Sequence, residues 1–279
     1  MNSTFLKKWR GFLSERKRVL DEKLFLKRIE DGFRNEEFQM HLQFIVDNKT
    51  KKLVSAEALS RWKNASGEVI FPGEYISFME KSGLIVRFDY YMFEKVCKKL
   101  SAWENSDFGE LAIACNITRI TISEKNFVTK IKEIAEQYHF DRSKLIIEIT
   151  EDCIEKNLDI AKQNIMKAKE LGFRIALDDI GNGYASLTSL CEYPIDMVKI
   201  DRELLLSDME SGRILFLGII SLAHKLNLKV VCEGVETEEQ NTLVSESDCD
   251  YIQGWYYTKA LPEKKAEAFA REYRKMLKR

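Results

Sequence analysis

Apolar residues recur along this chain in two alternating patterns, as short runs and as longer stripes at helical spacing. The short runs predict buried strands, and the stripes predict amphipathic helices. Strands are predicted over Phe38–Val46, Leu53–Trp62, Leu111–Asn116, Lys144–Thr150, Arg174–Asp178, Ile195–Asp201, Lys229–Glu233 and Tyr251–Gln253. Helices are predicted over residues 72–81, 88–103, 123–138, 155–171, 209–226, 237–246 and 262–278. About eight strands alternating with helices over ~240 residues are typical of an α/β protein with a (β/α)8, TIM-like barrel.

Two features at the start of the chain modify this picture. The first two predicted strands are joined only by the polar segment DNKTKK (47–52), and so short a turn joins antiparallel strands. We therefore expect an irregular barrel with an antiparallel first strand. Residues 1–30 are rich in Lys, Arg and Glu, with apolar residues at helical spacing, which predicts an amphipathic helical lead-in before a barrel domain over 31–279. A basic membrane-surface helix is the alternative, which the interspersed acids disfavour.

Composition narrows the class of protein. Hydrophobic residues make up 45% and charged residues 32% of the chain, as in a soluble globular domain. The net charge of −1 provides no basic field for a DNA or RNA duplex. No apolar run approaches the ~20 residues of a transmembrane segment, and no secretion signal is visible, so we expect a cytoplasmic protein. Six cysteines without a CxxC pair indicate reduced core thiols, and only three histidines are present. Any metal site must therefore be built from carboxylates.

The stretch Ile175 to Tyr184 (IALDDIGNGY) places two aspartates, Asp178 and Asp179, between an apolar run and a glycine-rich turn. Adjacent carboxylates at the edge of a core repel each other unless a cation keeps them ionised. Mg²⁺ and Mn²⁺ prefer such oxygen ligands. Because Asp and Gly are also common turn residues, an ordinary Asp-rich turn is the alternative interpretation.

Polar residues also lie at the ends of the other predicted strands, where a barrel builds its active site. These residues are Glu57, with Arg61 further along, Asn116, Glu148, Asp178, Asp179, Lys199, Asp201, Glu233 and Gln253. The set contains acids, amides, one lysine and one arginine, but no serine, cysteine or histidine. It therefore favours a site for two divalent metals and argues against covalent catalysis.

The run Glu57-Ala58-Leu59-Ser60-Arg61-Trp62 resembles the signature of EAL domains, the phosphodiesterases that hydrolyse cyclic di-GMP. A three-letter match is weak by itself, but further motifs follow in family order over about residues 30–265. They are Gln43 at the QP position, Asn116-Ile117-Thr118 for NxS, Glu148-Ile149-Thr150-Glu151 for EITE, residues 178–186 (DDIGNGYAS) for DDFGTGYSS, Lys199-Ile200-Asp201-Arg202 for KIDR, Glu233-Gly234-Val235-Glu236-Thr237 for EGVET, and Gln253-Gly254 for QG.

The resemblance implies two Mg²⁺ or Mn²⁺ ions. Their implied ligands are Glu57, Asn116, Glu148, Asp178, Asp179 and Glu233. Asp178 falls at the metal-bridging position. Glu233 can be assigned as a ligand or as a base, and we favour the ligand.

The resemblance also assigns catalytic and substrate-contacting roles. The implied catalytic set is Lys199, which matches the lysine that orients the attacking water, together with Glu233 and Glu236. Substrate contacts are implied at Gln43, Leu59, Arg61, Asp201 and Gln253. Glu236 and Gln253 match residues that hydrogen-bond the metal ligands. For Asp201, a salt bridge with Arg202 or a helix cap is the alternative to a contact with guanine.

Several residues depart from the family pattern around the turn after the two aspartates, which Glu151 is implied to anchor. Ile180 replaces Phe, Asn182 replaces Thr and Ala185 replaces Ser, while Phe44 replaces the proline of QP. Because these substitutions remove a hydroxyl and an aromatic ring, we expect the turn to be held less firmly. The implied metal ligands are unchanged. We therefore expect the altered turn to affect the turnover rate and its dependence on dimerisation.

The complete ligand set favours a metal-dependent enzyme that hydrolyses cyclic di-GMP to linear pGpG. The alternatives are a catalytically weak or inactive cyclic di-GMP receptor and a protein-interaction module. We also expect a homodimer, and the N-terminal helices are a candidate surface for a protein partner. The sequence leaves the turnover rate, the preferred metal and the regulatory input open.

Overall fold

The structure is a computed structural model that describes residues 22–150, 153, 159–180, 190, 193–201, 203 and 210–278. It divides into two compact units. The smaller unit comprises the chain up to Gln39 together with Ser60–Glu74, and the larger unit comprises Met40–Leu59 together with the chain from Tyr75 onward.

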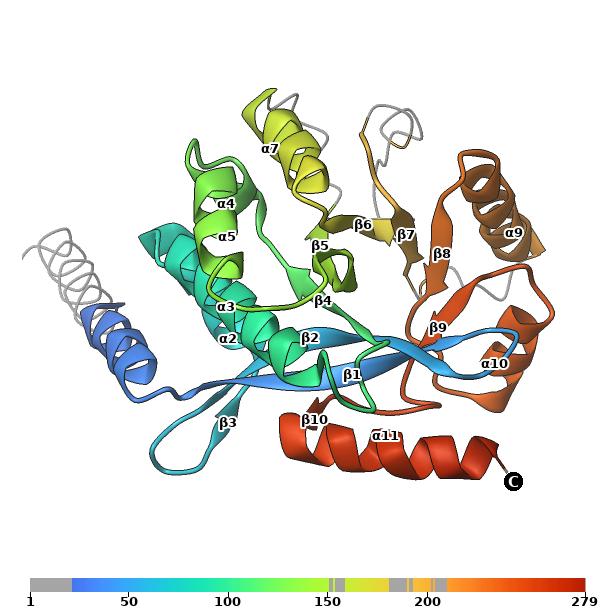
Figure 1. Ribbon diagram of the computed structural model, residues 1–279, viewed down its shortest axis with the longest axis horizontal. Helices are drawn as coiled ribbons and strands as arrows, with labels where there is room; N and C mark the ends of the chain where they lie inside the picture. Colours follow the sequence, from blue (N-terminus) through green and yellow to red (C-terminus); the bar gives the residue numbers. More distant parts are fainter. Residues whose placement is uncertain are drawn as a thin grey trace, which may run out of the picture. The chain divides into compact units, whose positions relative to one another are not determined.

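Eight strands close into a barrel in the order β1-β9-β8-β7-β6-β5-β4-β2, with β2 pairing back to β1 (Figure 1). They are β1 (Phe38–Asp47), β2 (Leu53–Lys63), β4 (Ala112–Asn116), β5 (Leu145–Thr150), β6 (Arg174–Ile180), β7 (Met197–Ile200), β8 (Lys229–Cys232) and β9 (Tyr251–Gln253). The pairs from β2 through β4 to β9 are parallel, whereas β1 is antiparallel to β9. The predicted α/β barrel with an antiparallel first strand is confirmed.

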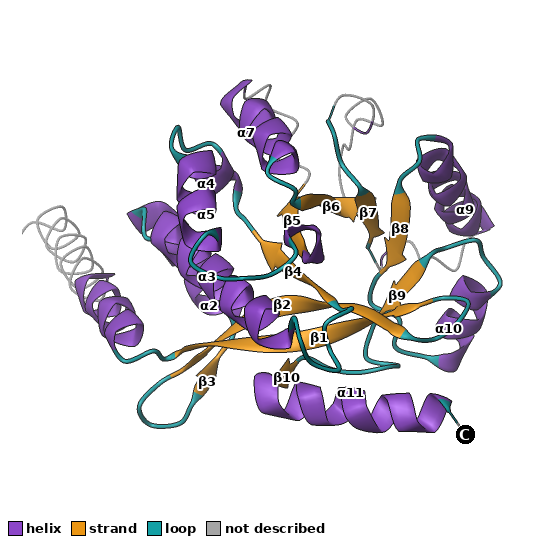
Figure 2. Ribbon diagram, viewed as in Figure 1, coloured by secondary structure: helices purple, strands orange, loops and turns teal. Residues whose placement is uncertain are grey.

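Helices of the larger unit surround the strands (Figure 2). They are α3 (Ile85–Trp103), α4 (Arg119–Ile122), α5 (Phe127–Ala135), α7 (Asp159–Glu170), α9 (Glu210–Lys225), α10 (Glu238–Ser245) and α11 (Glu263–Leu277), with a 3-10 turn, η1 (Arg142–Lys144). The helix predicted over 123–138 is shorter in the structure, because a turn covers residues 123–126 and α5 spans only Phe127–Ala135. The short helix α4, before that turn, was not predicted. The prediction also missed β10 (Leu261–Pro262), which pairs with β1 and is too short to carry a hydrophobic pattern.

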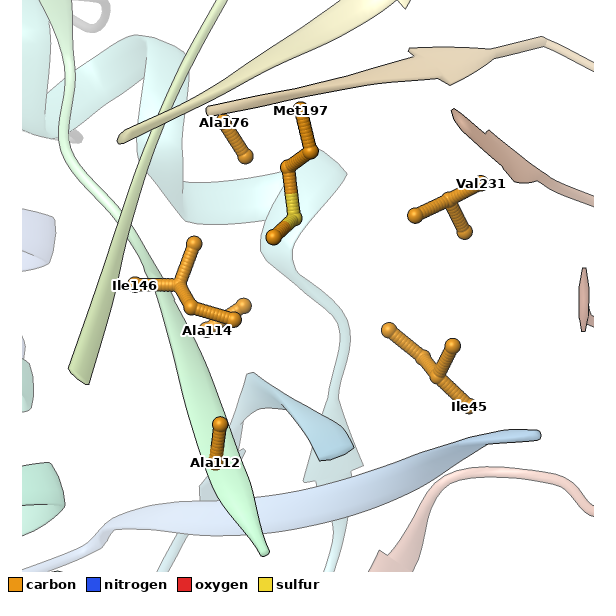
Figure 3. Packing of buried hydrophobic residues seen from close by; sticks show 7 residues of the cluster. All are labelled: Ile45, Ala112, Ala114, Ile146, Ala176, Met197 and Val231. Carbon is orange, nitrogen blue, oxygen red and sulfur yellow. The ribbon is translucent and has the colours of Figure 1, made fainter. Parts of the chain in front are cut away.

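The barrel interior is filled by a layer of apolar side chains that point toward one another (Figure 3). The layer consists of Ile45, Ala112, Ala114, Ile146, Ala176, Met197 and Val231. Alanines alternate with larger residues, so the narrow space is filled without crowding. The cysteines within the described residues (Cys97, Cys115, Cys153, Cys232 and Cys249) are buried free thiols, as predicted, and Cys191 lies outside that part of the chain.

In the smaller unit, residues 22–34 are helical and bury Ile29 and Phe33. The Phe38 ring packs in tilted geometry against Phe33, with ring centroids 4.9 Å apart, and against Trp62, with centroids 5.2 Å apart. The Trp62 indole nitrogen donates to a Glu37 carboxylate oxygen (2.8 Å). The unit also contains β3 (Val69–Ile70), a second short strand that the hydrophobic pattern did not predict, and it includes the start of α2 (Pro72–Ser82).

The helical prediction for the lead-in therefore holds for the part that the structure describes, and residues 1–21 lie outside it. The boundary at residue 30 stays a prediction. None of the helices in the described ranges combines the length and apolar character needed to cross a bilayer.

Candidate active site

The site residues share the inward face of each strand with the core layer. Side chains alternate between two faces along a strand, so a residue two positions further on points the same way. Five candidate residues each follow a core residue by two positions: Asn116 follows Ala114, Glu148 follows Ile146, Asp178 follows Ala176, Lys199 follows Met197 and Glu233 follows Val231. The polar site is thus the next layer of the barrel interior, at the carboxyl ends of the parallel strands.

Lys199 lies at the centre of this layer and is 2% exposed. Its ammonium nitrogen is 2.7 Å from Glu233 Oε1, 3.3 Å from Asp178 Oδ1 and 3.6 Å from Glu57 Oε2. It also donates to Glu148 Oε1. One ammonium therefore contacts carboxylates from β2, β5 and β6 and from the residue that follows β8.

Two amide side chains donate hydrogen bonds to the Glu57 carboxylate, one to each oxygen. Asn116 Nδ2 donates to Oε1 (2.8 Å), and Gln253 Nε2 donates to Oε2 (2.6 Å). Glu57 is buried, and its Oε2 also lies 3.6 Å from the Lys199 ammonium nitrogen. Because a buried carboxylate needs such partners, its orientation is determined by β4, β7 and β9 together.

The two aspartates are placed by an irregular backbone. The predicted strand end at Asp178 is wrong, because β6 continues to Ile180, with a register shift against β7 between Leu177 and Ile180. Asp179 has a φ of 61°, in the left-handed region that non-glycine residues rarely adopt. In a regular strand the two neighbours would point to opposite faces. Here Asp178, Asp179 and Glu233 have ligand atoms within 4.8 Å of one another.

The electrostatics of the layer are dominated by excess negative charge. Burial lowers the pKa of Lys199, but the surrounding carboxylates, Asp178 foremost, raise it well above its ordinary value. Burial raises the pKa of Glu148 and of Glu233 well above the usual range, against the opposing effect of Lys199. For Asp178 the contact with Lys199 and several hydrogen bonds outweigh burial and lower the pKa. Burial thus disfavours the several negative charges that surround one ammonium, so further positive charge would stabilise the site.

The donor set fits hard divalent cations. Two groups have ligand atoms within 4.8 Å of one another, namely Glu57, Glu148 and Glu233, and Asp178, Asp179 and Glu233. Glu148 Oε2 and Gln253 Oε1 are buried with no hydrogen-bond partner among the described residues. All these donors are oxygens, which Mg²⁺ and Mn²⁺ prefer.

A pocket of about 270 Å³ opens beside this layer. Besides Glu57 and Glu233, it is lined by five residues with predicted catalytic or substrate roles, which are Gln43, Leu59, Asp201, Glu236 and Gln253. Sequence reasoning missed Trp255, which also lines the pocket and is 56% exposed. The sequence feature that could have indicated this residue is its position directly after Gln253-Gly254. Pockets that bind nucleotides commonly use such an exposed ring for stacking.

Individual pocket residues have defined partners. Gln43 Nε2 donates to the Thr258 carbonyl oxygen (3.2 Å). The Asp201 carboxylate accepts from the Glu203 backbone nitrogen (2.6 Å), which fits the capping alternative for this residue. The Glu236 backbone nitrogen donates to Gln240 Oε1 (2.7 Å) at the start of α10.

The remaining predicted residues and family-pattern positions are not among those that line the pocket, or they lie outside the described residues. Arg61 belongs to the smaller unit, where its guanidinium lies over the Phe71 ring (5.1 Å), so its substrate role stays a prediction. Phe44, at the proline position of the family, is buried and stacks on Phe269 of α11 (5.9 Å). Ile180 is buried at the end of β6. Glu151, Asn182, Ala185 and Arg202 lie outside the described residues.

Comparison with known proteins identifies relatives of the whole barrel. Signaling protein YkoW of Bacillus subtilis is 31% identical over 244 residues, which are 86% of this chain and 30% of YkoW. Cyclic di-GMP phosphodiesterase NbdA of Pseudomonas aeruginosa is 30% identical over 88% of this chain and 32% of NbdA. Cyclic di-GMP phosphodiesterase PdeR of Escherichia coli is 32% identical over 81% of this chain and 34% of PdeR. The chain spans about a third of the length of these curated relatives.

Solved structures share the fold closely. The PaMucR phosphodiesterase in complex with c-di-GMP superposes with a TM-score of 0.82 at 27% identity, covering 86% of this chain and 98% of that one. An EAL domain protein from Listeria monocytogenes EGD-e gives a TM-score of 0.75 at 30% identity, covering 87% and 96%. The family model for the EAL domain matches residues 26–260. Since the match covers the complete barrel and the site at its carboxyl end, this chain belongs to the EAL domain family.

Proposed function

We propose that this protein is a divalent-metal-dependent phosphodiesterase that hydrolyses cyclic di-GMP to linear pGpG. The observation that carries the proposal is the convergence of carboxylates from β2, β5, β6 and the end of β8 on the Lys199 ammonium. Every position implied to hold metal is filled by an oxygen donor. Relatives named cyclic di-GMP phosphodiesterases, and the c-di-GMP complex of PaMucR, support the same substrate.

In this proposal two Mg²⁺ or Mn²⁺ ions are held by Glu57, Asn116, Glu148, Asp178, Asp179 and Glu233. When bound, such ions activate water and stabilise charge on phosphoryl oxygens. Lys199, positioned between the carboxylates, orients the attacking water with its ammonium group. Glu236 and Gln253 support the ligands through hydrogen bonds, and Glu151 anchors the turn after the two aspartates. Gln43, Leu59, Arg61, Asp201 and Gln253 contact the dinucleotide.

We also propose that the protein acts as a homodimer in the cytoplasm. The face of α9 supports self-association, because Ile214, Leu215 and Leu217 are 65%, 51% and 41% exposed. Exposed apolar side chains gathered on one helix favour burial against a partner. Analytical ultracentrifugation of wild type and Leu217→Lys tests this, since the lysine should shift a dimer toward monomer. Identical sedimentation of two monomeric samples would contradict the dimer.

The activity is tested by incubating the purified protein with cyclic di-GMP and Mn²⁺ or Mg²⁺, with an EDTA control, and separating the products. Glu57→Gln should lose both turnover and Mn²⁺ affinity, because an amide replaces a buried ligand carboxylate of nearly equal size. Glu246→Gln, which neutralises an exposed acid beyond α10, is the matched control and should behave like wild type. Intact but bound nucleotide would indicate the receptor instead, and absence of binding and turnover would contradict both.

A further inference from the structure

Asp89 is a buried acid outside the site described above. It lies on α3, which packs against β4 and α4, and the residue is only 3% exposed. A carboxylate in this position is costly unless hydrogen bonds compensate for the loss of water. Burial raises its pKa to about 6, although hydrogen bonds from Thr118 and Thr121 oppose the shift. Both threonines lie in the segment that follows β4.

These contacts concentrate on Thr118. Asp89 Oδ2 accepts hydrogen bonds from the Thr118 backbone nitrogen (2.9 Å) and from its hydroxyl (2.6 Å). The same hydroxyl lies 3.2 Å from the Thr121 hydroxyl, in the first turn of α4. Two bonds to one charged oxygen restrain both the backbone and the side chain of Thr118, and bonds to ionised groups are the stronger kind.

Thr118 is two residues beyond Asn116, the last residue of β4. The residue between them is restrained as well, because the Ile117 backbone nitrogen donates to the Glu148 carbonyl oxygen (2.8 Å). Asn116 in turn donates to Glu57 Oε1 (2.8 Å). The chain therefore leaves β4 through three successive restrained residues, and Asp89 provides the last of these restraints from the helix layer. Metal ligands require positions accurate to about 0.5 Å, which such supporting bonds provide.

We propose that Asp89 is a positioning residue of the metal centre, which fixes Thr118 and thereby the direction in which Asn116 presents its amide to Glu57 and to the metal. This inference rests on the proposed function, because it assumes that Asn116 is a ligand. It assigns to α3, which contributes no residue to the pocket or the metal ligands, a part in metal affinity.

The test measures Mn²⁺ binding by isothermal titration calorimetry at about pH 8, above the pKa of Asp89, with the thermal midpoint recorded for each variant. Asp89→Ala should weaken Mn²⁺ binding about tenfold, the range found for residues that support metal ligands. Asp89→Asn should recover affinity to within about threefold of wild type, because its amide oxygen still accepts from the Thr118 nitrogen.

Asn48→Ala is the matched control. Asn48 is likewise buried, and its amide nitrogen donates to the carbonyl oxygens of Val244 and Cys249 (3.0 and 2.9 Å), next to the start of β9 at the opposite end of the barrel. It should lower the thermal midpoint without changing Mn²⁺ affinity. If Asp89→Ala does not fold, Thr118→Val replaces it, with an expected loss of about threefold.

Wild-type affinity in whichever of these two variants is measured would overturn the proposal, and so would an equal loss of affinity in Asn48→Ala. Absence of Mn²⁺ binding by the wild type would overturn the proposed function together with this inference, so the two failures are distinguishable.

Discussion

Replacement of Lys199 by methionine should destabilise the metal-free protein far more than a typical lysine substitution. Coulomb's law at an effective dielectric constant of about 20 gives roughly 5–6 kcal/mol for each charge contact at the distances found here. Desolvation of the ammonium offsets much of this attraction, and burial, which raises the pKa of Glu148 and of Glu233, opposes the ionisation of these carboxylates. Loss of one partner from a buried charge cluster leaves a net cost of about 3–5 kcal/mol. For a domain of this size, that lowers the thermal midpoint by about 10 °C.

The assay is thermal unfolding followed by circular dichroism in EDTA and again in Mn²⁺. Divalent cations should restore more stability to Lys199→Met than to wild type, because they supply the missing positive charge. Lys229→Met is the matched control, since Lys229 pairs with Asp250 at 2.6 Å but its side chain is 57% exposed. An exposed pair contributes about 1 kcal/mol or less. If both variants lost equal stability in EDTA, the electrostatic interpretation of the site would be wrong.

Three further outcomes are expected. In Gly254→Ala the added Cβ would lie 1.9 Å from the Val235 carbonyl oxygen, so the backbone must shift and displace Gln253, which should weaken Mn²⁺ binding measurably by calorimetry. Trp255→Ala should raise KM for cyclic di-GMP about tenfold with little change in kcat, because a base loses its stacking surface, and an unchanged KM in steady-state kinetics would contradict this. The Asp89 pKa of about 6 lies above the ordinary value of 3.8. Between these values the folded protein retains a proton that the unfolded chain releases, so the free energy of unfolding falls as pH rises from about 4 to 6. This contribution amounts to at most about 3 kcal/mol, and Asp89→Asn should remove it in urea unfolding curves measured across that range.

Much of the fold follows from periodicity along the chain. Apolar runs predicted all eight barrel strands, and the short turn before Leu53 predicted the antiparallel first strand. Local patterns suffice for these because a buried strand must be apolar and a six-residue connection cannot cross a barrel. Two-residue strands such as β3 and β10 carry no such pattern, and their pairing depends on the segments against which they pack.

The candidate site residues were likewise selected from sequence. Glu57, Asn116 and Glu233 were recognisable because charged or amide groups interrupt otherwise apolar strand ends, where they are costly without a function. The period of two along each strand then places them in one layer. Sequence reasoning missed Trp255, since a lone aromatic residue after a glycine does not distinguish a stacking surface from core packing.

The tertiary structure alone decided how these residues meet. The sequence determined which strands carry acids, but only barrel closure brings four of their carboxylates to one Lys199 ammonium. The positive φ of Asp179 and the bond from Thr118 to Asp89 also depend on packing between segments far apart in the chain. Local propensity depends on the residues that are adjacent in sequence, whereas charge balance, the orientation of ligand side chains and burial depend on residues that are adjacent in space.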